Sequence, residues 1–170
     1  MRHRKSGRKF GRKSGPRLAL ERSIVSSLFT NGRIVTTLAR AKEYRGSAER
    51  LITLARRGIA AKERGDAAGW LHAYRRAIAA LGSSRSGERV ARQLFESIAP
   101  QFRDRNGGYT RVVRNWRGRL GDNAPTAVFE LVGYTPAPAA GEGEDAGEGE
   151  EAAEGAETAA EGAGKSRPRA

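Results

Sequence analysis

The chain has 170 residues, with 32 Lys and Arg against 19 Asp and Glu, and it contains no cysteine. Residues 1–135 hold 29 of the cations and 10 of the acids, a net charge of +19, whereas residues 136–170 carry a net charge of −6. The length allows one domain with a core. The lack of thiols excludes disulfides and thiolate metal sites. The net positive charge of residues 1–135 indicates a polyanionic partner.

The sequence opens with a basic segment, MRHRKSGRKFGRKSGPR, which has no acid and only Phe10 as a large apolar residue. Its regularly spaced glycines each disfavour a helix by roughly 1 kcal/mol, so residues 1–16 are predicted to form an arm that is disordered or extended on its own. Phosphates of a nucleic acid would neutralise the arm's mutually repelling cations and release counterions, although a solvated tail would have the same composition. The arm's candidate RNA-binding residues are Arg2, His3, Arg4, Lys5, Arg8, Lys9, Arg12 and Lys13.

Apolar residues at helical spacing follow the arm. Leu20, Ile24 and Leu28 recur every four residues and predict a first helix over residues 17–30. The next segment, residues 33–37, is β-branched after its arginine and predicts a short strand.

A second helix is predicted to start after this strand and to end near Arg57. Thr36 or Thr37 is its candidate N-cap, because a threonine oxygen can accept a hydrogen bond from a free backbone N–H. The outward face of the helix is rich in Arg and Lys, and only Glu43 and Glu49 balance them. This excess of positive charge indicates that the face binds an anionic partner, because a helix face that only contacts solvent usually carries charges of both signs.

Two further helices are predicted. Residues 59–64 prolong or loosely follow the second helix, and Asp66 is a candidate N-cap for a third helix over 67–81. A fourth helix is predicted over 87–98, with Pro100 beyond its end. The residues expected to pack the third helix are Leu71, Tyr74, Ile78 and Leu81.

The pattern then changes to β-structure. Residues 109–116 and 126–132 are β-rich runs on either side of the turn-forming segment 118–125. Alternation along the second run puts three side chains on one face, as in a half-buried strand, and we expect a hairpin to which the early strand adds a third member. The three inward side chains are Ala127, Phe129 and Leu131.

These elements predict an α+β domain over residues 17–135, with about four helices packed on one face of a small three-stranded sheet. Beyond Pro136 no apolar residue is larger than alanine and acids are frequent. We expect residues 136–170 to form a disordered acidic tail.

A second candidate RNA-binding site starts at a pair of glycines. Gly107 and Gly108 let a backbone approach a phosphate closely. Tyr109 and Thr110 carry hydroxyls that can donate hydrogen bonds to phosphate or ribose. The arginines that follow can pair with phosphate oxygens. An ordinary turn into a strand with outward arginines would have the same residues. The arginines assigned to this site are Arg111 and Arg114.

No catalytic site is expected. His3 lies in the arm and His72 lies at the margin of the third helix, which leaves no metal-ligand spacing, and GRKFGRKS lacks the spacing of a phosphate-binding loop. We therefore expect no enzyme activity, cofactor, metal or small-molecule substrate. No apolar run approaches the 18 or more residues that span a bilayer, and no apolar segment of a secretory signal follows the basic start, so a cytoplasmic protein without a membrane partner is expected.

Several blocks of the sequence, in order, resemble one known family. They are MRHRKSGRKFGR, SLFTNGRIVTTLARAKEYR with LITLARRG, GGYTR and GDNAPTAVFELV. The chain resembles the family of the seventeenth protein of the bacterial large ribosomal subunit over roughly residues 1–58 and 87–134. The segment 59–70 is longer than in compact members, and Gly15-Pro16 stands where the family commonly has a Ser-His-like pair.

The resemblance implies a structural protein, one copy per particle, that binds large-subunit ribosomal RNA near the exit of the nascent-chain tunnel and contacts neighbouring ribosomal proteins. It also implies an α+β domain with an N-terminal extension threaded into RNA. Residues carried over are those of the arm, the segment 107–111, and Thr36, Thr37 and Lys42. Two alternatives remain open from the residues alone: a free nucleic-acid binder, either DNA-compacting or an RNA chaperone, and a hydrolase acting on RNA.

Overall fold

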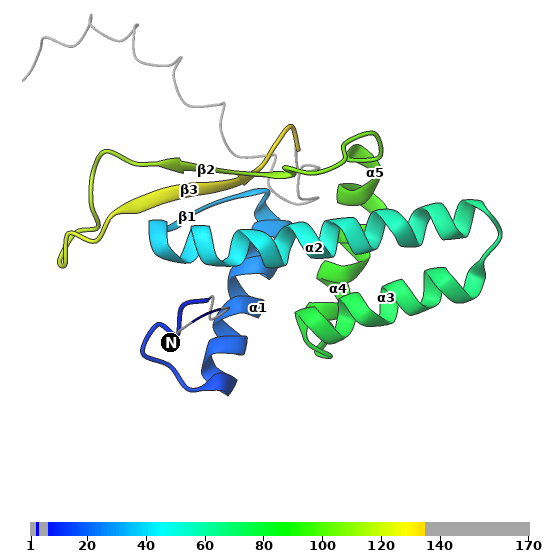
Figure 1. The fold of residues 1–170 in the computed structure, drawn as a ribbon, viewed down its shortest axis with the longest axis horizontal. Helices are drawn as coiled ribbons and strands as arrows, with labels where there is room; N and C mark the ends of the chain where they lie inside the picture. Colours follow the sequence, from blue (N-terminus) through cyan, green and yellow to red (C-terminus); the bar gives the residue numbers. More distant parts are fainter. Residues whose placement is uncertain (1–2, 4–6, 135–170) are drawn as a thin grey trace, which may run out of the picture. The chain divides into compact units, whose positions relative to one another are not determined.

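The computed structural model describes His3 and residues 7–134 (Figure 1). The predictions for Arg2, Arg4 and Lys5, and for the acidic tail 136–170, lie outside these residues. The described part of the chain combines helices with a three-stranded antiparallel sheet. The predicted α+β class is confirmed.

The predicted elements are all present, with differences at their ends. The helices are α1 (Ser14–Asn31), α2 (Leu38–Glu63), α3 (Ala67–Leu81) and α4 (Arg85–Gln93). A π-helical turn, η1 (Leu94–Ile98), and a short α5 (Ala99–Gln101) continue α4. The strands are β1 (Arg33–Thr37), β2 (Thr110–Arg114) and β3 (Thr126–Leu131).

The sheet has the order β1-β3-β2, so the early strand joins the β2–β3 hairpin as its third member, as predicted. Phe129 of the central strand β3 pairs in register with Ile34 on one side and Val112 on the other. These side chains face α2, which packs against all three strands. In Figure 1 the sheet follows one side of α2 and α3 follows the opposite side.

The opposite face of the sheet carries a row of three valines. Val35 is 66% exposed and Val113 is 46% exposed, whereas Val128 between them is only 7% exposed. Val128 is buried on this face because a residue on the central strand is flanked by side chains from both neighbouring strands.

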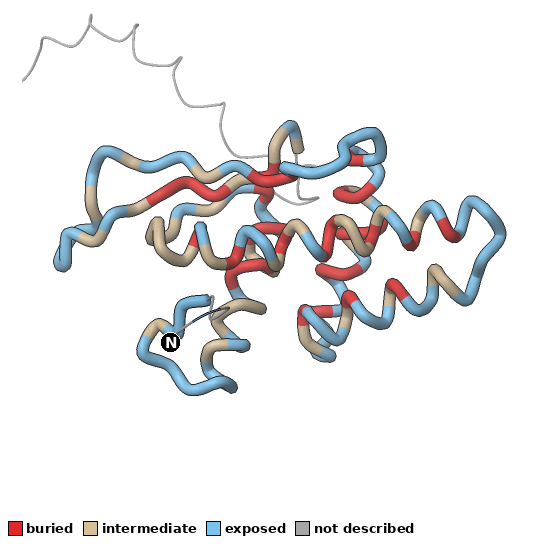
Figure 2. Tube along the Cα trace, in the orientation of Figure 1, coloured by how far each residue is buried: buried red, intermediate tan, exposed pale blue. Residues whose placement is uncertain are grey.

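The core lies where α1, the middle of α2, η1 and the sheet meet (Figure 2). An apolar stripe with helical period buries four residues of α1, as the sequence predicts. The largest fully buried side chains are Tyr109, Phe29, Phe129, Leu28, Ile52, Leu94, Ile98 and Val25.

The packing of α3 follows the prediction in part: Leu81 is buried, and Tyr74 and Ile78 are partly buried against the core. Leu71 is 38% exposed, and the buried residues of this helix are Ala73, Ala77 and Leu81. The contact with α2 is too close for large side chains, since a Cβ atom placed on Gly58 of α2 would lie 2.8 Å from the Cβ of Ala73. The two antiparallel helices therefore meet through small residues.

The two glycines inside α2 allow a matched test of this close contact. We expect Gly58→Ala to destabilise the fold by about 1 to 2 kcal/mol, because the clash with Ala73 outweighs the gain in helix propensity. Gly46→Ala should stabilise it by about 0.5 to 1 kcal/mol, because no other atom lies within 4 Å of the added Cβ. Urea unfolding of both variants measures the difference; equal midpoints would contradict the close packing.

The ends of α2 partly follow the prediction. Thr37 is at the N-cap position, but its side chain accepts no backbone hydrogen bond, and the N–H of Leu38 donates instead to the carbonyl of Pro125 at 2.9 Å. The helix continues past Arg57 to Glu63, as the expected prolongation allows. Asp66 caps α3 as predicted and accepts from the N–H of Gly69 at 2.9 Å.

The prediction that Pro100 lies beyond the end of the fourth helix is wrong. The helical path continues through η1 into α5, which contains Pro100. In the π-helical turn the N–H of Ala99 donates to the carbonyl of Leu94, five residues back, which widens the helix just before the proline. This widening accommodates a residue that has no N–H and would clash with a regular α-helical turn.

Candidate nucleic-acid interface

The described part of the basic arm contacts the first turns of α2. The backbone N–H of Arg8 donates to Glu43 Oε1 at 3.1 Å, and the ring centroids of Phe10 and Tyr44 are 5.8 Å apart. Gly11 and Phe10 both have positive φ angles, of 63° and 52°, which turn the segment. The sequence did not predict this anchoring of the arm on α2.

The arm keeps its charged side chains at the surface. The predicted RNA-binding residues His3, Arg8, Lys9, Arg12 and Lys13 are all exposed, and none forms an ion pair within the described part of the chain. Phe10 is partly buried against the core. The one large apolar residue of the arm therefore attaches it, and its cations face solvent.

Tyr44, which receives Phe10, is itself deeply buried at 3% exposure. Its hydroxyl has no hydrogen-bond partner among the described residues. Burial, together with the negative charges of Glu21 and Glu43, raises the pKa of the Tyr44 hydroxyl. The tyrosine is accordingly a neutral part of the surface on which the arm rests.

A groove lies between the start of α2 and strand β2. It is lined by Leu38, Lys42, Arg45, Thr110, Arg111, Val112 and Arg114. Three of its cations come from two elements: Lys42 and Arg45 from α2, and Arg114 from β2. None of these three forms an ion pair with another described residue, so their positive charge is available to an anion.

The groove joins two predicted groups of residues. Lys42 belongs to the segment that starts with Thr36 and Thr37, and Arg114 belongs to the glycine-led segment. Thr36 and Arg114 are both in register with Ala127, on opposite sides of the central strand, and so lie on the same face of the sheet. Arg45 is an additional groove residue that sequence reasoning did not single out, although it is one helical turn from Lys42.

Arg111 differs from the other cations near the groove. Its guanidinium lies 3.6 Å from Glu130, which also contacts Arg33 at 3.7 Å from the other edge strand. These pairs are mostly exposed, so solvent screens them and each contributes little to stability. One carboxylate thus partly balances two arginines on the outer face of the sheet.

The roles predicted for Tyr109 and Thr110 are corrected. Tyr109 is 2% exposed and Thr110 is 8% exposed, so neither side chain is at the surface. The Thr110 hydroxyl donates to Glu49 Oε1 at 2.9 Å, and the Tyr109 hydroxyl accepts from Arg56 Nη1 at 2.7 Å. Thr110 is the first residue of β2 and lies on the same face as Val112, towards α2, whereas Tyr109 precedes the strand and is held by its hydrogen bond to Arg56 and by the ring of Phe102, whose centroid is 5.4 Å away. The backbone of Gly107 and Gly108 is exposed and unobstructed.

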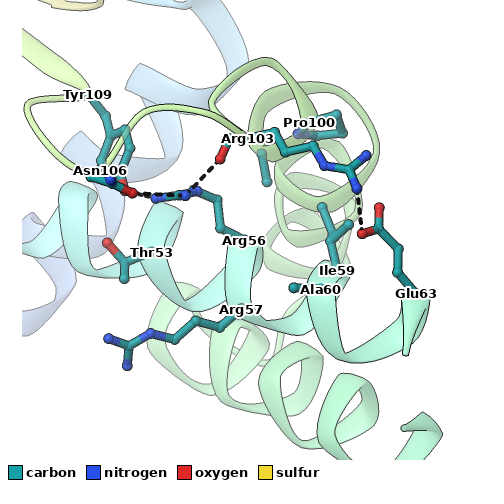
Figure 3. A pocket seen from close by; sticks show the side chains of 11 residues that line it. Thr53, Arg56, Arg57, Ile59, Ala60, Glu63, Pro100, Arg103, Asn106 and Tyr109 are labelled. Carbon is teal, nitrogen blue, oxygen red and sulfur yellow. Dashed lines mark hydrogen bonds and ion pairs between the residues drawn. The ribbon is translucent and has the colours of Figure 1, made fainter. Parts of the chain in front are cut away.

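A second cavity lies beside Tyr109, between α2 and the segment after α5 (Figure 3). The guanidinium of Arg56 is held on its floor, because it donates both to Tyr109 and to the carbonyl of Arg103, each at 2.7 Å. Arg103 in turn pairs with Glu63 at 2.7 Å. Figure 3 shows that Arg57 points away from this network, and it forms no ion pair with another described residue.

The exposed cations occupy two places around the first turns of α2. The exposed cations of the arm lie on one side of the first turns of α2, through the contacts of Glu43 and Tyr44, and the groove with Lys42 and Arg45 lies on the other. Exposed cations without ion-pair partners among the described residues can neutralise successive phosphates. No described helix is long and apolar enough to cross a membrane.

Comparison with known proteins decides the family. A model of the family described as ribosomal protein L17 matches residues 20–132 of the chain. The chain belongs to the ribosomal protein L17 family. As a member of this family it is a ribosomal protein of the large subunit and not an enzyme, and the cytoplasmic ribosome is its location.

Individual relatives match along most or nearly all of their length. The large ribosomal subunit protein bL17 of Thermus thermophilus is 48% identical over 132 residues, which are 78% of this chain and 99% of the relative. The bL17 protein of Desulfotalea psychrophila is 47% identical over 140 residues, 82% of this chain and 96% of the relative. That of Syntrophotalea carbinolica is 46% identical over 132 residues, 78% of this chain and 75% of the relative. The resemblance noted in the sequence is confirmed.

Proposed function

We propose that this protein is a structural constituent that binds and stabilises large-subunit ribosomal RNA through the arm and the groove between α2 and β2. The observation that carries the proposal is the cluster of Lys42, Arg45 and Arg114, which have no ion-pair partner among the described residues, together with an arm whose described cations are all exposed. Such a surface fits RNA phosphates, whose negative charge its cations would neutralise.

The contacts are expected to be mostly to phosphates and 2′-hydroxyls. Double-helical RNA has a deep, narrow major groove that side chains cannot read, and its wide minor groove offers backbone and hydroxyl groups. The arm supplies charge neutralisation, and the groove on α2 positions the domain against the same backbone. The exposed backbone at Gly107 and Gly108 can approach a phosphate without obstruction.

The family membership supports the finer parts of the proposal. We place the protein near the exit of the nascent-chain tunnel, in one copy per particle, with neighbouring ribosomal proteins as its other contacts. A free nucleic-acid binder, such as a DNA-compacting protein or an RNA chaperone, is the competing function and has the same charge requirements.

Sedimentation of a cell lysate at rising salt separates these functions. Simple phosphate neutralisation weakens with salt by a power of about 0.7 to 0.9 per contact, so a loosely adhering basic protein is washed off. We expect the chain to remain with the large subunit after a high-salt wash. Movement to the top of the gradient, or co-sedimentation with DNA, would contradict the proposal and favour the free binder.

A further inference from the structure

The loop that joins β2 to β3 exposes two large apolar side chains. Trp116 is 89% exposed and Leu120 is 92% exposed, the highest values among the large apolar residues of the described chain. The hairpin projects away from the helices, at the end of the sheet opposite α5 (Figure 1). No described part of the chain covers this hairpin tip, which we define as residues 115–125.

The hairpin tip is held in one conformation by its own hydrogen bonds. The N–H of Arg119 donates to the carbonyl of Ala124 and the N–H of Asn123 donates to the carbonyl of Arg119, both at 2.9 Å. Gly118 is required there, because a Cβ atom at this position would lie 2.9 Å from the backbone oxygen of Asn123. The tip therefore presents its apolar residues without needing a partner to order it.

An internal ion pair adds to this order. Arg119 donates to both carboxylate oxygens of Asp122, from Nε at 3.0 Å. That hydrogen bond, followed by the one from the N–H of Ala124, lowers the pKa of the Asp122 carboxyl to about 2. The pair is thus charged at physiological pH, and it links residues 119 and 122 within the hairpin tip.

The surroundings of Trp116 are cationic. Arg114, Arg117 and Arg119 come from the same hairpin, and Asp122 is its only acid between residues 110 and 129. The Arg117 guanidinium lies 4.7 Å from the centroid of the Trp116 ring. Because the side chain is 89% exposed, the ring still offers a free face.

We propose that Trp116 stacks on an unpaired base of large-subunit ribosomal RNA, while Arg117 contacts the neighbouring phosphates. This inference rests on the proposed function and names one contact of it. Stacking of an aromatic ring on a base suits splayed bases in loops and bulges, because bases inside an A-form duplex are covered. Arg114 and Arg117 have no ion-pair partner among the described residues, and this uncompensated positive charge favours the phosphate-rich RNA as the partner.

The intrinsic fluorescence of the full chain provides the test. The chain has two tryptophans, Trp70 and Trp116, and Trp70 stacks on Tyr74 with ring centroids 5.4 Å apart. Trp70→Phe keeps an aromatic ring there and makes Trp116 the single reporter. On titration with protein-free large-subunit ribosomal RNA refolded in Mg²⁺, we expect its emission to be quenched and its access to acrylamide to fall.

Affinity for the same RNA is the second measurement. We expect Trp116→Ala to weaken binding about 5- to 100-fold, the range typical of a lost base stack, and Trp116→Phe to recover most of the loss. The salt dependence of binding should not change, because no phosphate contact is removed. Leu18→Ala, which truncates an exposed residue on α1, is the matched control and should bind as the parent does.

The outcomes separate this inference from the function on which it rests. If Trp116→Ala binds like the parent and Trp116 stays accessible in a complex that remains salt-dependent, the base-stacking contact is refuted and ribosomal RNA binding stands. If the parent chain does not bind the RNA, both fail. If Trp116 is shielded only in complete large subunits, a neighbouring protein covers it and the proposal is overturned.

Discussion

Neutralising the exposed cations of the arm is expected to weaken binding to large-subunit ribosomal RNA by on the order of a hundredfold at physiological salt. The arm carries most of the polyanion contact in our proposal, and its cations have no competing acid partner among the described residues. The affected residues, each changed to Gln, are Arg8, Lys9, Arg12 and Lys13.

The salt dependence of that binding is the sharper readout. Each phosphate contact contributes about 0.7 to 0.9 to the slope of log affinity against log salt, so losing four contacts lowers the slope by about 3. Filter binding or fluorescence anisotropy at several salt concentrations gives both the affinity and the slope. An unchanged slope would show that the arm does not touch phosphates.

A control variant keeps the same change in net charge. It replaces four exposed arginines on α3 and α4, away from the arm and the groove, and should lower the slope by clearly less. These are Arg75, Arg85, Arg89 and Arg92. If both variants lose affinity equally, binding depends on net charge alone and the arm has no special role.

Phe129→Ala is expected to have the largest effect on stability, a loss of about 3 to 5 kcal/mol. Phe129 is fully buried on the central strand, between Ile34 and Val112, and it closes the core under α2. The loss combines the transfer free energy of the ring with the cavity left behind. It should lower the melting temperature by about 10 to 20 °C, measured by circular dichroism.

Two companion variants make this prediction specific. Val35→Ala, on the exposed face of the same sheet at 66% exposure, should change stability by no more than about 0.5 kcal/mol. Phe129→Leu keeps most of the volume and should cost less than about 2 kcal/mol, which gives a folded variant even if Phe129→Ala is too unstable to purify. Equal melting temperatures for Phe129→Ala and Val35→Ala would contradict the assigned core.

The segments with a strong apolar period, and those bounded by capping or turn residues, were predictable. Ile24 and Leu28 lie on one face of α1 because period and burial agree there. Asp66 is the N-cap of α3, as predicted, because a capping side chain accepts a hydrogen bond from a backbone N–H only two or three residues further along the chain. The alternation along β3 placed Phe129 and Leu131 inside correctly.

The errors occur where distant segments meet. Leu71 was expected in the core from its apolar character, but it is 38% exposed, and Ala73 makes the close contact with Gly58 of α2 instead. Pro100 was expected to follow the end of a helix, but it lies inside the helical path. The wider π-helical turn before it accommodates a residue that has no backbone N–H to donate. Tyr109 was expected to bind RNA from its neighbours in sequence, but its side chain is buried and its hydroxyl accepts a hydrogen bond from Arg56.

By itself the sequence determined the class of fold, the basic character of the domain and its family, because these depend on composition, local periodicity and the order of short blocks. Only the tertiary structure decided which cations share a surface. Lys42 and Arg114 are far apart in the chain and meet because α2 packs on the sheet beside β2. The same packing buried Thr110, since the side of a strand that faces a helix depends on long-range pairing.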